Sequence, residues 1–362
     1  MQNNCNNSPL DQLYFYLTQG CNLRCRHCWI APEYRSEENP GKYLSAELFK
    51  RIVEEAKVLG LTRVKLTGGE PLLDPDINEI IRIIKNEELG LTVETNGLLC
   101  THEIAQELSI CKDIFVSVSL DASKPEIHDV IRGVKGAFEG TVAGIKNLVN
   151  AGIKPQIIMS VMKQNRDEIE PIVMMAQDLG AGSVKFNLIE PTARGKKMHD
   201  EDETIPVKEL IEIGKWVERS LAEKVDINLF YGYPAAFRAL SKMFGKDGDG
   251  CSACGIKNIL GVLSDGSYAL CGIGKNVPEL VFGHAGKDRL CEVWKKACIL
   301  KELRAGLPNK LEGVCGQCLM KNLCLGSCIA QNFYRNKSLF APFWFCEEAD
   351  KTGLFPESRK VP

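Results

Sequence analysis

Hydrophobic and polar positions along the first half of the chain follow two alternating periods. Short apolar runs with the two-residue period of a strand are each followed by a tract whose apolar residues recur every three or four positions, as in a helix. The expected strands are residues 13–18, 63–67, 91–95, 114–120, 155–161 and 183–188. The expected helices are 45–60, 76–87, 101–110, a tract ending at 151, 167–180 and 207–222.

Six strand–helix units in succession predict an α/β fold of parallel strands joined by right-handed crossovers. Six units rather than eight favour an open barrel, and a doubly wound sheet is the alternative. In both architectures ligands collect at the carboxyl ends of the strands. We therefore expect the functional residues where these strands end, and a loop leaving the barrel at residues 191–195.

Composition and charge exclude several classes of protein. The chain has 362 residues, 44% hydrophobic and 25% charged, as expected for a globular protein large enough for two domains. Its net charge of -2 offers no electrostatic reason to bind nucleic acid or an anionic membrane. The sequence has no signal-peptide pattern and no apolar run of the ~18 residues that span a bilayer. We therefore expect a cytoplasmic protein.

The 16 cysteines are strongly clustered along the chain. Because cytoplasmic thiols stay reduced, metal or cluster ligation is a better interpretation than disulfides. No cysteine lies within residues 112–250, whereas residues 251–346 are rich in them. This change predicts a barrel over residues 1–224, a linker over 225–250 and a cysteine-rich domain over 251–362.

The densest group of thiols follows the first expected strand. Cys21, Cys25 and Cys28 are separated by three and two residues, and such a triplet can hold one iron–sulfur cluster. Three ligands on a four-iron cluster leave one iron open to a substrate or cofactor. A zinc site or a redox-sensing cysteine group is the alternative, although no fourth ligand follows nearby.

This loop resembles the C-x3-C-x-φ-C signature of radical S-adenosylmethionine (SAM) enzymes, with His27 at the φ position. The resemblance implies a partial (β/α)6 barrel and a 4Fe–4S cluster that binds SAM. Reductive cleavage of SAM gives a 5′-deoxyadenosyl radical, which removes a hydrogen atom from the substrate. An electron donor of the flavodoxin or ferredoxin type is also implied.

Motifs at other expected strand ends resemble SAM-binding elements of the same family. Gly68, Gly69 and Glu70 precede a proline and match the Gly-Gly-Glu-Pro clamp for the methionine amino group, although this motif alone more often marks a turn. By the same resemblance Arg132 would pair with the methionine carboxylate, and Leu188 would lie near the adenine. The remaining implied cofactor contacts are Thr95, Asn96, Ser119 and Asp121. Without the resemblance, Asn96 would be interpreted as part of a turn, Asp121 as a helix cap and Arg132 as an exposed surface residue.

Eight cysteines in the C-terminal region form two further groups. Their C-x2-C pairs are also zinc signatures, so two zinc ribbons are an alternative. Their order resembles the SPASM extension of radical SAM enzymes, which implies two auxiliary clusters and three 4Fe–4S clusters in all. The implied ligands are Cys251, Cys254, Cys271 and Cys328 for auxiliary cluster I, and Cys315, Cys318, Cys324 and Cys346 for auxiliary cluster II.

SPASM enzymes mostly modify peptides or proteins, so the resemblance implies a short peptide or protein substrate. The expected product is an oxidised or crosslinked ribosomal peptide with a thioether or carbon–carbon bond. Alternatives are anaerobic sulfatase maturation to formylglycine, haem or porphyrin side-chain modification, and a non-enzymatic iron–sulfur electron carrier. Because only about twenty residues precede the cysteine loop, we expect no winged-helix leader-binding module there. No catalytic base is assigned.

Overall fold

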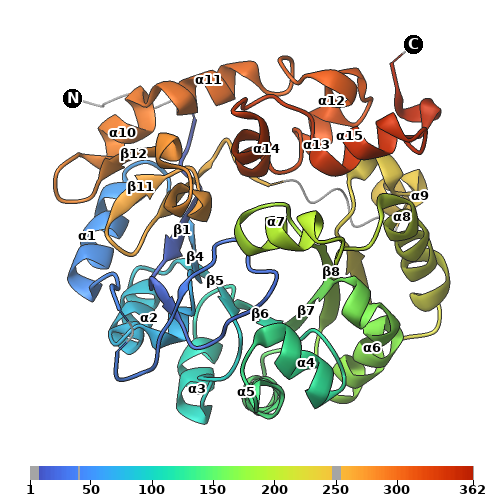
Figure 1. Cartoon of the computed structure of the whole chain (residues 1–362). Helices are drawn as coiled ribbons and strands as arrows, with labels where there is room; N and C mark the ends of the chain where they lie inside the picture. The colour runs from blue at the N-terminus through green and yellow to red at the C-terminus, as the bar shows by residue number, and fades with distance from the viewer. Residues whose placement is uncertain (1–7, 40, 247–253, 362) are drawn as a thin grey trace.

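A ten-stranded sheet forms the centre of the molecule, as seen in a computed structural model that describes residues 8–39, 41–246 and 254–361. The strand order is β12-β11-β10-β1-β4-β5-β6-β7-β8-β9. The sheet curves around a central space, and helices cover its outer side (Figure 1).

Six parallel strands of this sheet are those expected from the sequence. They pair in the order β1-β4-β5-β6-β7-β8, each parallel to the next. The prediction of a partial (β/α)6 barrel is therefore confirmed. The strands are β1 (Gln12–Tyr16), β4 (Arg63–Thr67), β5 (Gly90–Thr95), β6 (Phe115–Ser119), β7 (Gln156–Val161) and β8 (Ser183–Leu188).

The expected helices occur with changes at their ends. Ser45 caps the first helix by accepting a hydrogen bond from the Leu48 amide. The long tract ending at 151 is two helices, because Gly133 ends the first with a φ of 72°, which favours glycine. The outer helices are α1 (Ala46–Lys57), α2 (Ile77–Asn86), α3 (His102–Ser109), α4 (Pro125–Arg132), α5 (Ala137–Asn150), α6 (Ile169–Asp178) and α8 (Val207–Trp216). A 3-10 turn (Lys163–Glu168) precedes α6, and a π-helical turn (Val217–Leu221) follows α8.

The sheet extends beyond the six expected strands at both sides. β9 (Asn228–Tyr231) pairs with β8 inside the expected linker, and β10 (Ile259–Val262) pairs in parallel with β1. The antiparallel strands β11 (Ser267–Ala269) and β12 (Val281–His284) follow. An uncovered β1 would expose unpaired backbone groups, and β10 satisfies them. The boundaries expected after residues 224 and 250 therefore separate β9 and β10 from the six barrel strands, although all of these strands belong to one continuous sheet.

The rest of the C-terminal region, in orange and red in Figure 1, lies along the top of the view between α1 and α8. The expected loop at 191–195 is wrong, because α7 (Ala193–Asp200) begins within it. Among the described residues, none of the helices is long and apolar enough to cross a membrane. The other short elements are β2 (Gly20–Cys21), β3 (Glu33–Tyr34), α9 (Leu240–Phe244), α10 (Leu290–Lys296), α11 (Cys298–Gly306), α12 (Gly313–Gln317), α13 (Lys321–Cys324), α14 (Ile329–Asn336) and α15 (Trp344–Lys351).

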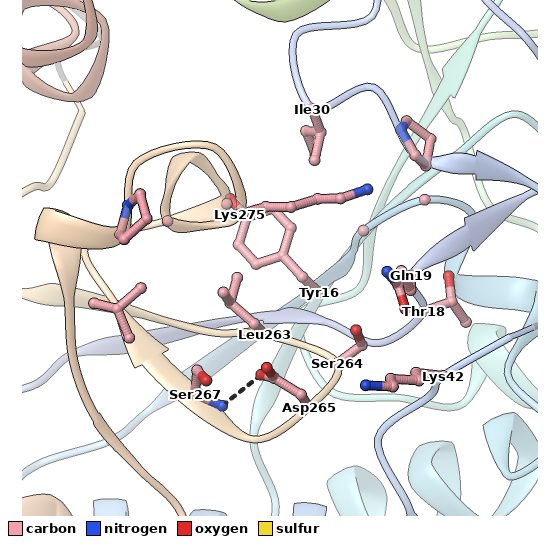
Figure 2. Close-up of a pocket in the computed structure, with 17 residues that line it drawn as sticks. Tyr16, Thr18, Gln19, Ile30, Lys42, Leu263, Ser264, Asp265, Ser267 and Lys275 are labelled. Carbon is pink, nitrogen blue, oxygen red and sulfur yellow. Dashed lines mark hydrogen bonds between the residues drawn. The ribbon is translucent and has the colours of Figure 1, made fainter.

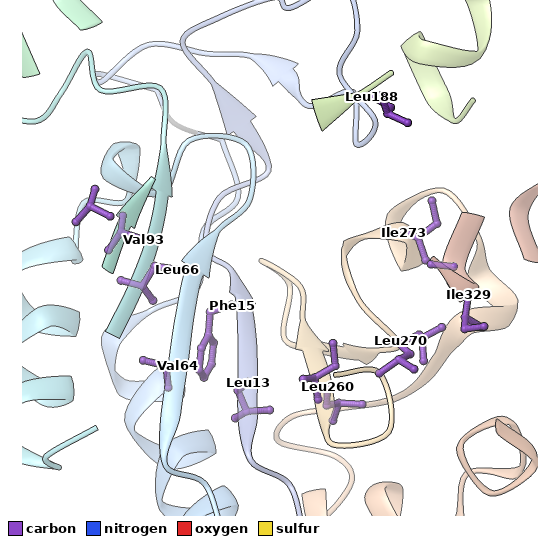
Figure 3. Close-up of a cluster of buried hydrophobic side chains, with 14 of the residues drawn as sticks. Leu13, Phe15, Val64, Leu66, Val93, Leu188, Leu260, Leu270, Ile273 and Ile329 are labelled. Carbon is purple, nitrogen blue, oxygen red and sulfur yellow. The ribbon is translucent and has the colours of Figure 1, made fainter. Parts of the chain in front are cut away.

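One hydrophobic core joins the barrel to the C-terminal region (Figure 3). On the outer side of β1, the Phe15 ring packs on Phe49 of α1 with centroids 4.3 Å apart. The same cluster of buried side chains includes Leu260 of β10 and Ile329 of α14. Burying each such side chain contributes about 1.5–3 kcal/mol. This shared core holds the C-terminal region as a wall of the barrel mouth.

The carboxyl group of Asp74, near the start of α2, is buried without full hydrogen bonding. Its Oδ1 accepts a hydrogen bond from the Asp76 amide at 2.9 Å, whereas Oδ2 has no partner among the described residues. Burial raises the pKa of Asp74 from 3.8 to about 7. The folded protein therefore binds the carboxyl proton of Asp74 more tightly than the unfolded chain does. As a result, the free energy of unfolding should fall as pH rises from about 4 to 7.

We expect Asp74→Asn to remove this pH dependence. At pH 8 the variant should unfold with a free energy about 1–3 kcal/mol higher than the parent, because it removes a buried, incompletely paired charge. At pH 5, where the folded parent is protonated, the difference should nearly vanish. Urea denaturation at both pH values measures this, with the exposed Asp226→Asn as control. An equal difference at both pH values would contradict the assignment.

Candidate active site

A cavity of about 320 Å³ opens at the carboxyl ends of the barrel strands. Residues far apart in sequence line it, which agrees with the position expected for a ligand site in parallel α/β folds. The structure brings together most of the residues singled out from the sequence: Cys21, Cys25, His27, Cys28, Gly68, Gly69, Glu70, Thr95, Asn96, Ser119 and Arg132.

The three thiols of the first cysteine group lie at this cavity, and those of Cys21 and Cys25 accept hydrogen bonds. The Cys21 sulfur accepts from the Leu23 amide at 3.4 Å, and the Cys25 sulfur accepts from Arg132 Nη1 at 3.6 Å. Burial raises the pKa of both thiols, so their thiolates need compensating positive charge. In the described part of the chain, no three His, Cys, Asp or Glu side chains could hold a single metal ion. The donor set of three thiols around a cavity fits a 4Fe–4S cluster, which is several ångströms wide.

His27 places an uncharged ring in the wall of the cavity. Burial lowers the pKa of its imidazole to about 4, so the ring is neutral at physiological pH. Its Nδ1 is buried and has no hydrogen-bond partner among the described residues. A buried polar atom without a partner is costly, and a ligand in the cavity could satisfy it.

The two glycines after β4 let two backbone segments meet. Gly68 has a φ of 132°, which side-chain-bearing residues rarely adopt. A Cβ on Gly69 would lie 1.8 Å from the carbonyl oxygen of Gly20, which directly precedes Cys21. Only glycine at this position allows the β4 end to contact the cysteine loop.

Glu70 organises the wall of the cavity through its hydrogen bonds. Its Oε1 accepts from Thr95 Oγ1 at 2.6 Å, and its Oε2 accepts from the Asn96 amide at 2.8 Å. Burial raises the pKa of Glu70 to about 7, against the effect of these hydrogen bonds. Asn96 in turn donates to Asn22 of the cysteine loop at 2.7 Å. This network ties the ends of β4 and β5 to the loop that carries the thiols.

Arg132 reaches the cavity and is held by a buried carboxylate behind it. Its Nε lies 2.8 Å from Asp121 Oδ2, and the Asp121 side chain is fully buried. Burial alone would raise the pKa of Asp121, but the guanidinium keeps that pKa below its usual value. Asp121 does not line the cavity, and at the end of β8 it is Asn187, rather than Leu188, that does so.

Three further charged residues line this site but are not among the cofactor contacts expected from the sequence. Arg194 of α7 donates to the carbonyl oxygen of Cys25 at 3.1 Å and to that of Pro32 at 2.9 Å, and so clamps the cysteine loop. Lys65 and Glu94 form an ion pair and line the same cavity. Their inward positions on β4 and β5 follow from strand alternation, which could have identified them.

Four C-terminal cysteines form a second thiol group. Cys315, Cys318, Cys324 and Cys346 line one small cavity of about 20 Å³. A side-chain hydrogen bond with Cys346 lowers the pKa of Cys315. The group is the one expected for auxiliary cluster II, whose presence stays a prediction.

A third thiol group faces the barrel. Burial raises the pKa of Cys328, and the nearby charges of Glu190, Cys271 and Cys254 raise it further. These are three of the four cysteines expected for auxiliary cluster I, and the fourth, Cys251, lies outside the described residues. Ligation by this group also stays a prediction.

The fold and the comparisons with known proteins identify a radical SAM enzyme. A model of the radical SAM superfamily matches residues 15–176. The chain belongs to this superfamily and to its SPASM-type branch, whose members use a 4Fe–4S cluster and SAM.

Three similar proteins illustrate the relationship. An AdoMet-dependent heme synthase of Methanosarcina barkeri is 32% identical over 86% of this chain and 88% of that protein. Mycofactocin maturase MftC of Mycolicibacterium smegmatis is 26% identical over 97% of this chain and 86% of that protein. The crystal structure of Streptococcus suis SuiB bound to precursor peptide SuiA matches with a TM-score of 0.73 at 19% identity, covering 94% of this chain and 76% of SuiB.

Proposed function

We propose that this enzyme removes a hydrogen atom from a residue of a ribosomally made peptide, giving an oxidised or crosslinked product. The main support is the similarity to mycofactocin maturase MftC. It extends over 97% of this chain and therefore includes both the cavity and the C-terminal cysteines.

In this proposal the residues around the cavity bind and orient the cofactors. Cys21, Cys25 and Cys28 would hold the cluster, which supplies the electron that cleaves SAM to a 5′-deoxyadenosyl radical. The backbone at Gly68 and Gly69 would receive the methionine amino group. The Arg132 guanidinium, oriented by its buried partner, would receive the methionine carboxylate. Thr95, Asn96, Ser119 and the end of β8 near Leu188 would complete the SAM site, with the neutral His27 ring beside it.

The eight C-terminal cysteines would hold two auxiliary clusters, which gives three 4Fe–4S clusters per chain. Four thiolates on each auxiliary cluster would leave no iron free to bind substrate, so these clusters would serve in electron transfer. A flavodoxin or ferredoxin would supply the reducing electron. This arrangement suits a net oxidation, because an electron must leave the substrate after the hydrogen atom has been removed.

Modification of a porphyrin side chain is the second candidate function. It is favoured by the 32% identity to an AdoMet-dependent heme synthase over 86% of this chain. Both candidates use the same SAM cavity, so the substrate rather than the initial chemistry separates them.

The proposed function is tested with anaerobically purified protein. Three clusters predict about 12 iron atoms per chain, whereas zinc ribbons would show zinc. Reduction in the presence of SAM should release 5′-deoxyadenosine, which a simple electron carrier would not do. Candidate peptides encoded beside the gene, and porphyrins, are then examined by mass spectrometry for loss of hydrogen or of a side-chain group. Absence of 5′-deoxyadenosine from iron-loaded protein would contradict the proposal.

A further inference from the structure

A second cavity, of about 510 Å³, adjoins the candidate active site. The two cavities share Ile30, Pro32, Gly68 and Gly69 in their walls. One side of the second cavity is built by the barrel at residues 16–42, and the other by the C-terminal region at residues 263–281. A molecule bound there would lie directly beside the SAM cavity.

The walls of this cavity combine an apolar surface with two lysines (Figure 2). Tyr16, Ile30 and Leu263 provide the apolar surface. Lys42 precedes α1, and Lys275 ends the 3-10 turn Gly272–Lys275 of the C-terminal region. In Figure 2 the two side chains enter from different sides of the cavity.

The charges of the lining are unbalanced. The lining contains two cationic residues, Lys42 and Lys275, and one anionic residue, Asp265, which leaves one excess positive charge (2 − 1 = 1). Asp265 Oδ1 already accepts a hydrogen bond from the Ser267 amide at 2.9 Å. Lys275 donates to the Ala31 carbonyl oxygen at 3.3 Å. Within the part of the chain that the structure describes, neither lysine has a carboxylate within ion-pair distance.

We propose that this cavity binds a carboxylate of the substrate, with Lys42 and Lys275 as its cationic partners and the apolar surface beneath the substrate body. The inference rests on the proposed function, because it assumes a substrate that must reach the SAM cavity. An acidic residue of a peptide and a propionate of a porphyrin both provide this chemistry. Charge-assisted hydrogen bonds in a partly enclosed site are stronger than those at an open surface.

Direct binding measurements on the cluster-loaded enzyme with SAM test this inference. The first pair of probes is deuteroporphyrin IX and its dimethyl ester. The second pair is two hexapeptides that differ only in one glutamate or glutamine. The acidic member of either pair should bind more tightly than its neutral partner. Its affinity should also fall as salt is added, because salt screens the attraction to the lysines. Calorimetry under anaerobic conditions measures each dissociation constant.

Lysine variants locate the carboxylate. Lys42→Gln and Lys275→Gln should each raise the dissociation constant of the acidic probe about three- to tenfold, while the neutral probe is unaffected. Lys275→Arg should largely restore binding because it keeps the charge. Lys146→Gln is the matched control, since Lys146 is exposed on α5 and does not line the cavity.

The outcomes separate this inference from the proposed function. A preference for the acidic peptide or for the acidic porphyrin supports the inference and identifies the source of the carboxylate. Equal affinity for acidic and neutral probes, or no binding of either pair, would overturn it. An equal loss of SAM affinity in the lysine variants would also overturn it, because the lysines would then belong to the SAM site. If carboxylate binding persists without formation of 5′-deoxyadenosine, the proposed function fails and the binding site stands.

Discussion

Replacement of Cys25 by alanine should abolish the release of 5′-deoxyadenosine and lower the iron content by about four atoms per chain. Cys25 is buried at the cavity proposed to bind SAM, and its sulfur accepts a hydrogen bond from Arg132 at 3.6 Å. The two thiols that remain would hold the cluster too weakly, and burial leaves no other ligand to replace the missing sulfur. Iron analysis and chromatography of the reaction products measure both effects.

Cys298→Ala is the control for this experiment. Cys298 is exposed at the start of α11 and belongs to none of the three thiol groups. The control should keep the parental iron content and the parental rate of 5′-deoxyadenosine release. If Cys25→Ala behaved like the control, the cluster would have to be held elsewhere, and the proposed role of the first cysteine group would be wrong.

Breaking the ion pair between Asp121 and Arg132 should have the largest effect on stability. Both side chains are almost completely buried, and Asp121 Oδ1 also accepts a hydrogen bond from the Ser160 amide at 2.8 Å. Asp121→Asn would leave the guanidinium charge buried without its partner, which costs about 3–5 kcal/mol. Urea denaturation of the cluster-loaded protein measures the loss. Weaker SAM binding should accompany it, because the guanidinium would no longer be oriented.

Two further variants establish that the loss comes from the pair. Asp121→Asn combined with Arg132→Gln should cost less than the sum of the single changes, because no unpaired charge is left behind. Lys197→Gln breaks the exposed pair of Lys197 on α7 with Glu201, which directly follows α7, and should cost under about 0.5 kcal/mol. If Asp121→Asn lowered the free energy of unfolding no more than Lys197→Gln does, the buried ion pair would not contribute to stability.

The sequence by itself determined the features that depend on neighbours along the chain. The strand and helix periods are local, so the six strand–helix units of the barrel could be recognised without a structure. Cysteine spacing is local as well, and so are the two glycines before Glu70. These motifs were sufficient to predict the superfamily, and most of the residues that they singled out line one cavity at the strand ends.

Only the tertiary structure decided which distant groups meet. β10 pairs with β1 because an open sheet edge needs backbone partners, and no local pattern specifies which strand provides them. The positions of Asp121 behind Arg132 and of Arg194 on the cysteine loop depend on how separate strand ends converge. Lys42 and Lys275 are 233 positions apart (275 − 42 = 233), and they line one cavity because the C-terminal region packs against the barrel mouth through a shared core.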